Sequence, residues 1–277
     1  MATKSDYGER EVAAAKSVLI ELMQILGEYR DQMVLVGGWV PFFLFGSAHI
    51  GSTDIDIALD KDEITEDVYS TIRQCLQSRG YKEGAQPYTF LREVKVDDAD
   101  SVIVKVDFLT GEYGGTGRNR RHQVVQPDLK ARKARGCELA LRYNARISVE
   151  GRMPDGTRNT VNLNLSDALP FIVMKGMVLY DRMKEKDAWD IYFCIKSFKE
   201  GIPALAEAFR PLLDNRLVME GLSKIRSKFT EVGSYGPASV AAFDEVADRD
   251  ARDQIRRDAY EQVKALLDLL GIQEYRQ

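Results

Sequence analysis

The spacing of apolar and polar residues divides the chain into two parts. In the first part, short runs of β-branched and aromatic residues are separated by turn residues, which indicates strands of a sheet. From residue 166 onward, apolar residues recur every three or four positions, which indicates helices that bury one face. We therefore predict an α+β fold with two domains. A mixed sheet with flanking helices occupies residues 1–165, and a helical C-terminal domain occupies residues 166–277.

The same pattern predicts the individual elements. Along the first domain we expect helix 7–29, strand 33–36, helix 39–45, strand 53–59, helix 65–79, strands 89–96 and 101–109, and strands 146–150 and 158–163. The two late pairs of strands are expected to be antiparallel, because turn residues join them. Ser166 is a favourable N-cap, so the second domain is expected to open with a helix over 167–184. Helices then continue, with breaks at 201–203 and 233–237.

Three aspartates lie inside apolar runs that otherwise indicate buried strands: Asp54, Asp56 and Asp107. Asp54 and Asp56 are two residues apart, so in a strand both point to the same face. Two carboxylates about 4 Å apart repel each other by roughly 4 kcal/mol at an effective dielectric constant near 20. A buried charge needs a partner or a metal ion, and a divalent cation removes this repulsion. The spacing therefore suggests a Mg²⁺ site for triphosphate chemistry.

The composition is that of an ordinary globular protein, since 44% of the 277 residues are apolar and 30% are charged. No apolar run approaches the roughly 20 residues that span a bilayer, and the N-terminus lacks the apolar segment of a signal peptide. We therefore expect a cytoplasmic protein without a membrane partner. The three cysteines are far apart and form no C-x-x-C pair, which argues against a zinc cluster or a disulfide framework. The two histidines argue against a histidine-based metal site.

The net charge of −4 carries no global signature of nucleic-acid binding. Between residues 118 and 146, however, basic residues strongly outnumber acidic ones. This basic strip begins after a glycine-rich segment that follows the Asp107 strand. The substrate that accepts the transferred group in triphosphate chemistry would need to enter there. Two interpretations remain open. The strip is either a solvated surface or a contact with RNA through Arg118, Arg120 and Arg121.

Two motifs resemble a known superfamily. The segments Val36–Trp39 (V-G-G-W) and Thr53–Asp56 (T-D-I-D) form a strand, a Gly-Gly turn, a helix and a strand with Asp-x-Asp, before a later strand that carries Asp107. This layout resembles the DNA polymerase β-like nucleotidyltransferases, and it looks most like the AbiEii and MenT-type toxin nucleotidyltransferases. The segments Leu169–Arg182 and Lys186–Ile191 are similar to the helical lysine and the K-x-x-D-like element of that family. The resemblance covers roughly residues 30–195.

The resemblance implies a polymerase β-like fold and a mechanism. Asp54 and Asp56 would hold two Mg²⁺ ions that bridge the triphosphate, and Asp107 would complete one metal site and orient or deprotonate the acceptor hydroxyl. The residues implied for binding the nucleoside triphosphate lie in the glycine turn, before the first aspartate and on the helical domain: Gly37, Gly38, Ser52, Thr53 and Lys175. The product is a nucleoside monophosphate attached to the acceptor, with pyrophosphate released.

The family also implies an acceptor and a biological role. We expect a macromolecular acceptor, best the 3′ end of tRNA, and a toxin of a toxin–antitoxin or phage-defence system with an antitoxin protein as partner. One alternative is a nucleotidyltransferase of small molecules such as aminoglycosides, although such a site should be lined by acidic residues. Another is a non-catalytic binding module that keeps the fold. The CCA-adding enzymes also have a Val-Gly-Gly turn before two aspartates, but the Arg-Asp pair that follows it there is missing here.

Several of these residues have alternative structural roles. Asp107 could pair with Arg92 or Lys105 instead of a metal ion. The Gly-Ser pairs at 46–47 and 51–52 compete with the Gly37 turn for the phosphates. In the helical domain, Lys175 could lie at the surface, and a structural role is expected first for a pair of aspartates with basic neighbours, namely Asp187 and Asp190 beside Arg182 and Lys186. His49 lies in an apolar run and is expected to be packed.

Overall fold

A computed structural model describes residues 3–64, 70–95, 100–112 and 122–276 of the chain. It divides into two compact units. The sheet unit consists of Tyr7–Val40 and Ile50–Asp167, and the helical unit consists of Pro41–His49, the chain from Ala168 onward and the N-terminal residues before Tyr7. The segment Pro41–His49 thus groups with the helices, although the sequence pattern places it inside the first domain.

The sheet unit is built on one mixed sheet with the strand order β3-β4-β5-β2-β1-β9-β8, to which β7 and β6 add beside β5. Parallel pairs join β2 to β5, β1 to β9 and β5 to β7, and the other pairs are antiparallel. The strands are β1 (Met33–Val36), β2 (Asp54–Leu59), β3 (Lys82–Glu83), β4 (Thr89–Lys95), β5 (Ser101–Thr110), β6 (His122–Gln126), β7 (Leu129–Lys133), β8 (Asn144–Arg152) and β9 (Arg158–Ser166).

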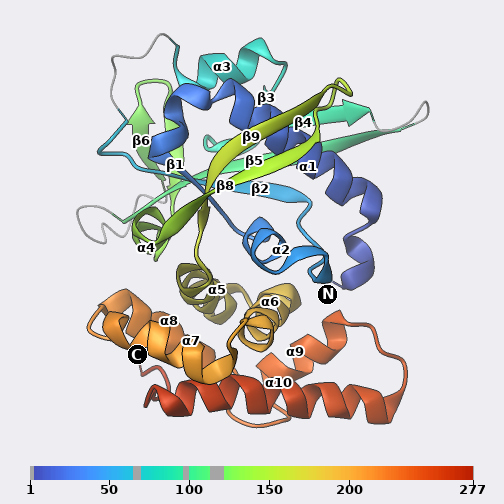
Figure 1. Cartoon of the computed structure of the whole chain (residues 1–277), viewed down its shortest axis with the longest axis vertical. Helices are drawn as coiled ribbons and strands as arrows, with labels where there is room; N and C mark the ends of the chain where they lie inside the picture. Colours follow the sequence, from blue (N-terminus) through green and yellow to red (C-terminus); the bar gives the residue numbers. More distant parts are fainter. Residues whose placement is uncertain (1–2, 65–69, 96–99, 113–121, 277) are drawn as a thin grey trace. The chain divides into compact units, whose positions relative to one another are not determined.

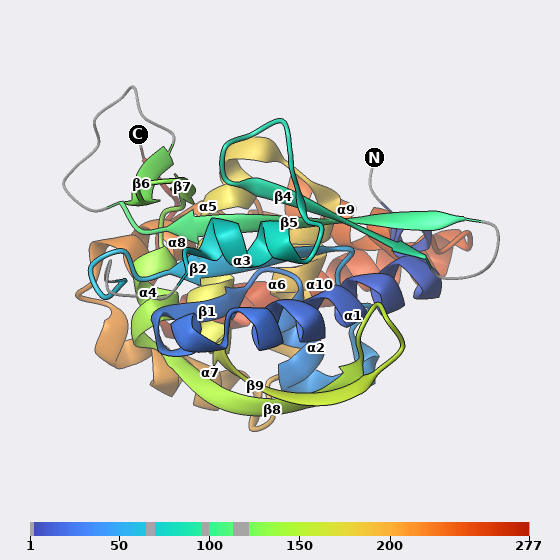
Figure 2. The ribbon, with the colours of Figure 1, turned by 90° about the horizontal axis from the view of Figure 1, so that it is seen from above.

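One face of this sheet forms the hydrophobic core of the unit. Residues paired across strands point to the same face, and successive residues alternate. The core face carries apolar side chains with almost no exposure, among them Ile55, Ile57, Val106 and Phe108. The helices α1 (Glu9–Ile25) and α3 (Ile72–Ser78) cover this face (Figure 1, Figure 2). Burial of these apolar side chains is the main source of stability of the unit.

The opposite face carries Asp54, Asp56 and Asp107 and is called the carboxylate face below. Toward the C-terminal end of β2 it is apolar, since Ala58 and Leu109 are buried there. Helix α4 (Cys137–Arg142) lies on the side of the sheet opposite α1 and α3 (Figure 1). The aspartates therefore lie next to the covered part of this face.

The helical unit is held together by apolar contacts among helices and by one cluster of buried charges. Helix α5 packs against α8 and α6, and α6 packs against α9 and α10. Its helices are α5 (Ala168–Arg182), α6 (Glu185–Ser197), α7 (Gly201–Phe209), α8 (Arg216–Arg226), α9 (Tyr235–Phe243) and α10 (Arg249–Leu269). No helix in the described ranges combines the length and the apolar composition that a bilayer crossing requires.

The predicted α+β fold, with a mixed sheet and flanking helices, is confirmed. Strand β1 and helix α2 (Trp39–Phe45) have the predicted bounds, and β4 and β5 form the predicted antiparallel pair. Two predictions are wrong. The helix expected over 65–79 begins at Ile72 in the described part, because Thr71 and Gln74 form a capping box there. Ser166 does not cap α5, because it ends β9 opposite Asn144.

Candidate active site

The pairing register of β2 and β5 brings the three predicted aspartates together on one face. Asp56 lies directly beside Asp107, and Asp54 lies directly beside Lys105. Since the strands are in register without a bulge, all four side chains leave the sheet on the carboxylate face. The sequence predicts that Asp54 and Asp56 share a face. The neighbouring position of Asp107 follows only from the strand pairing.

Two of the three carboxylates are held by hydrogen bonds within the sheet unit. Ser52 Oγ donates to Asp54 Oδ1 at 2.6 Å. Thr89 Oγ1 donates to Asp107 Oδ1 at 2.6 Å, and Lys105 Nζ donates to Asp107 Oδ2 at 2.8 Å. The ion pair with Lys105 is one of the two structural alternatives for Asp107, and it keeps this buried carboxylate paired. Both oxygens of Asp107 therefore have fixed partners.

Asp56 differs from its neighbours, because its carboxylate makes no hydrogen bond or ion pair to the described residues. Burial, followed by the negative charge of Asp54, raises the pKa of Asp56 to about 7. Asp107 adds to the rise, while the positive charges of Arg132 and Lys105 oppose it. A carboxylate with this environment is short of positive charge. A cation beside this carboxylate would reduce the repulsion from Asp54 and Asp107.

The glycine turn after β1 lies against this carboxylate. Gly37 has a φ of 72°, which favours glycine, and a Cβ atom there would overlap Asp56 Oδ2. The buried Trp39 at the start of α2 donates its Nε1 hydrogen to the backbone oxygen of Asp54 at 2.9 Å. Gly38 continues the turn, and Thr53 directly precedes β2. The turn and the start of β2 are thus fixed to each other.

Carboxylates are suitable ligands for a divalent cation. In their present positions, however, the three aspartate side chains do not surround a common metal position. Mg²⁺ prefers carboxylate oxygens, and Asp56 is a carboxylate that forms no ion pair with the described residues, on a face with two others. Among the described residues, however, no three histidine, cysteine, aspartate or glutamate side chains come close enough together to hold a metal ion. Asp54 and Asp107 are held by the hydrogen bonds to Ser52, Thr89 and Lys105. Bound cations would have to replace some of these contacts.

Lys175 belongs to a buried ion cluster of the helical unit. Its Nζ lies 2.7 Å from Asp187 Oδ1 and 2.6 Å from Asp190 Oδ2. The expected partners are present as well, since Arg182 binds Asp187 and Lys186 binds Asp190. The role of Lys175 in binding the triphosphate stays a prediction, and it requires the ammonium to exchange a carboxylate for a phosphate.

His49 is packed, as expected, and it is part of the same cluster. Its Nε2 forms a 3.0 Å hydrogen bond with Asp190 Oδ1, and its ring lies against Trp189 and Phe193. Burial lowers the pKa of His49, although the hydrogen bond and charge of Asp190 oppose the shift. Burial thus disfavours the charged form of this histidine, whose ring contributes to packing.

Arg132 on β7 is a residue near the site that the sequence analysis did not single out. It pairs with Leu109 of β5, so it leaves the sheet on the carboxylate face, two residues beyond Asp107 along β5. The sequence does contain a signal for this strand, because Leu129 and Ala131 alternate with Lys130 and Arg132. The run is short and strongly basic, so its alternating pattern is too weak to predict a strand. The predicted RNA contacts Arg118, Arg120 and Arg121 lie outside the described residues.

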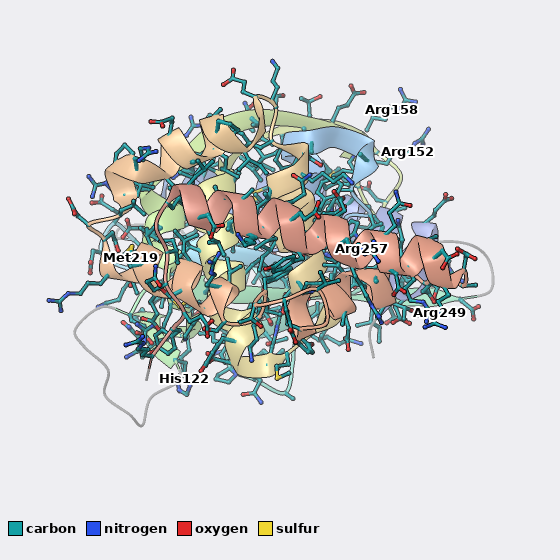
Figure 3. All side chains as sticks on the ribbon, turned by 90° about the horizontal axis from the view of Figure 1, so that it is seen from below. His122, Arg152, Arg158, Met219, Arg249 and Arg257 are labelled. Carbon is teal, nitrogen blue, oxygen red and sulfur yellow. The ribbon has the colours of Figure 1, made fainter. Side chains whose placement is uncertain are left out.

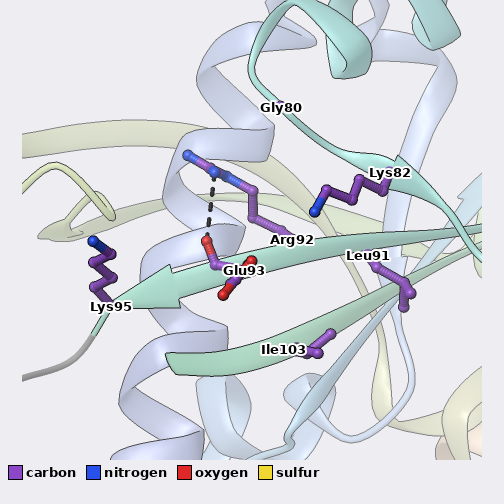
Figure 4. A pocket seen from close by; sticks show the side chains of 7 residues that line it. All are labelled: Gly80, Lys82, Leu91, Arg92, Glu93, Lys95 and Ile103. Carbon is purple, nitrogen blue, oxygen red and sulfur yellow. Dashed lines mark hydrogen bonds between the residues drawn. The ribbon is translucent and has the colours of Figure 1, made fainter. Parts of the chain in front are cut away.

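A pocket of about 290 Å³ opens on the β3–β5 part of the sheet unit (Figure 4). By register, Lys82, Leu91, Lys95 and Ile103 all lie on the carboxylate face. Arg92 points to the core face, where Glu21 of α1 binds its guanidinium, so it does not pair with Asp107. The pocket continues the carboxylate face away from the aspartates, and its exposed cations are lysines.

Comparisons with known proteins find similarity among solved structures only. No family model matches it, and no curated protein matches it. Among solved structures, JHP933 from Helicobacter pylori aligns with 95% of this chain and 94% of its own length, at 12% identity and a TM-score of 0.45. A second H. pylori protein, provisionally named a nucleotidyltransferase, aligns with 94% of this chain and 99% of its own, at 13% identity and a TM-score of 0.43. An antigenic nucleotidyltransferase-like protein from Paracoccidioides brasiliensis aligns with 74% of this chain and 92% of its own, at 18% identity and a TM-score of 0.39.

Proposed function

We propose that this chain is a Mg²⁺-dependent nucleotidyltransferase, which transfers a nucleoside monophosphate from a nucleoside triphosphate to a macromolecular acceptor. The observation that carries the proposal is the register of β2 and β5. It places Asp54, Asp56 and Asp107 on one face, and the Gly37 turn lies against Asp56. Three carboxylates on neighbouring strands lower the stability of the fold, so stability does not explain their presence. Carboxylates are the usual protein ligands of two-cation phosphoryl-transfer sites.

The chain's own residues divide the work between cation binding and proton transfer. Bound divalent cations would neutralise the charge of the triphosphate and of the leaving pyrophosphate. Asp54 and Asp56 would hold them, and Asp56 has its carboxylate free for this purpose among the described residues. Asp107 is oriented by Thr89 and Lys105. In the proposed mechanism it would orient the acceptor hydroxyl and take its proton.

The acceptor and the biological role follow from the family resemblance. We propose RNA as the acceptor, with the 3′ end of tRNA as the first substrate to test, and a toxin of a toxin–antitoxin or phage-defence system as the role. The abundance of basic residues between 118 and 146 supports an acidic acceptor. If radiolabel from a nucleoside triphosphate appeared in a small molecule and not in RNA, a small-molecule acceptor would be favoured instead.

The test is transfer of radiolabel from each α-labelled nucleoside triphosphate, with Mg²⁺, to total RNA and to purified tRNA. We compare the wild type with Asp56→Asn and with Asp62→Asn, which removes the same charge at an exposed position after β2. Asp56→Asn should fold, because asparagine has nearly the same shape and the carboxylate of Asp56 makes no hydrogen bond or ion pair to the described residues that the change would break. We expect labelled RNA with the wild type and Asp62→Asn, and background label with Asp56→Asn.

A non-catalytic binding module is the second candidate, and one observation favours it. Lys105 already neutralises Asp107, and no three acidic side chains in the described ranges converge on a metal position. This candidate requires that the wild type transfer no label with any nucleoside triphosphate. It also requires that the protein bind RNA with equal affinity in EDTA and in Mg²⁺.

A further inference from the structure

Arg132 lies on the carboxylate face with its charge unpaired within the described part of the chain. Its position follows from backbone pairing: Arg132 of β7 faces Leu109 of β5, and Leu109 follows Asp107 by two residues on the same face. The guanidinium lies over the Tyr88 ring, with 5.9 Å between the guanidinium carbon and the ring centroid. This contact holds the side chain over the sheet without using its hydrogen-bond donors.

The hydrogen bonding of Arg132 is incomplete. Its Nε atom is buried, and no acceptor among the described residues satisfies it. Buried donors without an acceptor are rare in folded proteins because they lose their contact with water and gain nothing in return. An arginine presents several donors in a planar fork, which matches two oxygens of a phosphate or carboxylate. Because Arg132 also lies on the carboxylate face beside the aspartates, its free donors can hold an anionic ligand at this position.

Two lysines that could otherwise meet the phosphates, one on the carboxylate face and one on the helical unit, already have carboxylate partners. Lys105 donates to Asp107, and Lys175 is bound to Asp187 and Asp190. A phosphate chain that approaches three carboxylates is repelled by them. It needs a positively charged side chain in addition to bound cations, and Arg132 is available for this without breaking an ion pair. The positive charge of Arg132 also acts on Asp56, whose pKa it lowers against the effect of burial.

We infer that Arg132 binds the phosphate chain of the nucleoside triphosphate at the carboxylate face. The inference rests on the proposed function, since it concerns the substrate of the same site. It assigns the phosphate contact to the sheet unit, in addition to the residues of the glycine turn. The ligand is recognised by its phosphates, so a molecule without base or sugar is sufficient to test the contact.

The test measures binding of inorganic tripolyphosphate and of Mg²⁺ by calorimetry. We compare the wild type with Arg132→Leu, Arg132→Lys and Arg158→Leu. Arg158 is exposed at the β8–β9 hairpin (Figure 3), so its replacement removes the same charge away from the site. With Mg²⁺ present, we expect Arg132→Leu to weaken tripolyphosphate binding at least tenfold. Arg132→Lys should restore part of the affinity, because a lysine keeps the charge but loses the planar fork.

The controls separate this inference from the proposed function. Arg158→Leu should bind tripolyphosphate within twofold of the wild type. Arg132→Leu should bind Mg²⁺ alone at least as tightly as the wild type does, because the removed charge opposes a cation beside Asp56. Equal tripolyphosphate affinity of Arg132→Leu and the wild type would overturn the assignment of Arg132 and leave the proposed function standing. If the wild type binds neither Mg²⁺ nor tripolyphosphate, both fail. Mg²⁺ binding by Arg132→Leu shows that this variant is folded, and partial recovery of tripolyphosphate affinity in Arg132→Lys shows that the charge contributes to the contact.

Discussion

At the scale of single residues, the site is defined by which carboxylates have partners. Asp107 is almost fully buried and receives hydrogen bonds from Thr89 and Lys105, whereas Asp56 receives none from the described residues. Lys105 is therefore the internal counter-ion of the carboxylate face. Burial would lower the pKa of this lysine, but its hydrogen bond to Asp107 and the charges of Asp107, Asp54 and Asp56 raise it. Its ammonium lies in the combined field of all three aspartates.

This arrangement predicts competition between Lys105 and a divalent cation. Replacing Lys105 by Met leaves Asp107 without its ion pair, so in EDTA we expect the free energy of unfolding to fall by about 1–2 kcal/mol, given the partial exposure of the lysine. The lost positive charge should also strengthen Mg²⁺ binding, so Mg²⁺ should stabilise the variant more than the wild type. Urea unfolding in EDTA and in Mg²⁺ measures both effects.

The matched control for this experiment is Lys95→Met. Lys95 lies on the same face of the sheet but near the far end of β4, and it is exposed. Its replacement should leave both unfolding curves unchanged. If Mg²⁺ stabilised Lys105→Met and the wild type to the same extent, lysine and cation would not share the site.

At the scale of elements, the sequence predicts those strands and turns whose residues carry a strong local signal. Strand β1 and helix α2 have the predicted bounds because a wholly apolar run ends at two glycines. The pairing of β2 with β5 could not be predicted from local pattern, because parallel strands far apart in sequence meet only through the whole sheet.

Strand β7, which carries Arg132, and its partner β6 were not predicted from the sequence for a related reason. In β6 (His122–Gln126) the apolar residues are only two adjacent valines between polar residues, and in β7 basic residues dominate the composition. The ion pair of Lys105 with Asp107 was one of two alternatives, and only the register decides between them, since Arg92 points to the core face. Candidate residues can thus be predicted from spacing, but their partners require the pairing of strands.

The turn between β1 and α2 allows a prediction about how closely these elements approach β2. Ala at position 37 has to adopt a positive φ, which costs about 1–2 kcal/mol, and its Cβ overlaps Asp56 Oδ2. Gly156, in the β8–β9 turn, has a φ of 84° and open space around the position of a Cβ atom. We expect Gly37→Ala to lower the free energy of unfolding by about 1–3 kcal/mol more than Gly156→Ala. Urea unfolding of the two variants gives this difference, and equal losses would contradict the contact with Asp56.

At the scale of the whole molecule, the two units hold their buried charges in opposite ways. In the sheet unit, burial and the neighbouring carboxylates raise the pKa of Asp56. In the helical unit, burial opposes the ionisation of Asp187 and Asp190, but the charge of Lys175 and further contacts with Arg182 and Lys186 outweigh it and lower both pKa values. The helical unit is thus stabilised by ionised carboxylates, and the site of the sheet unit is destabilised by one.

This difference predicts which of the two units unfolds first when the pH is lowered. The lowered pKa values of Asp187 and Asp190 mean that their stabilisation is complete above the ordinary aspartate pKa near 3.9 and is lost as the pH falls below it. The lowered pKa of His49 acts in the same direction from about pH 6.5 downward, because the unfolded chain takes up the proton first. Protonation of Asp56, by contrast, favours the folded sheet unit as the pH falls from 7 toward 4. We therefore expect the helical unit to unfold at a higher pH than the sheet unit.

The two tryptophans make this order measurable without a change in sequence. Trp39 is buried in the sheet unit, and Trp189 is buried in the helical unit beside His49. In protein labelled with 5-fluorotryptophan and kept at a fixed moderate urea concentration, each residue gives its own ¹⁹F resonance during an acid titration. The Trp189 resonance should reach its unfolded position at a higher pH than the Trp39 resonance. In Asp190→Asn, the Trp189 transition should depend less on pH below 4, because one of the two titrating groups is gone. Loss of the Trp39 signal first would show that the buried ion cluster does not control the acid stability of the helical unit.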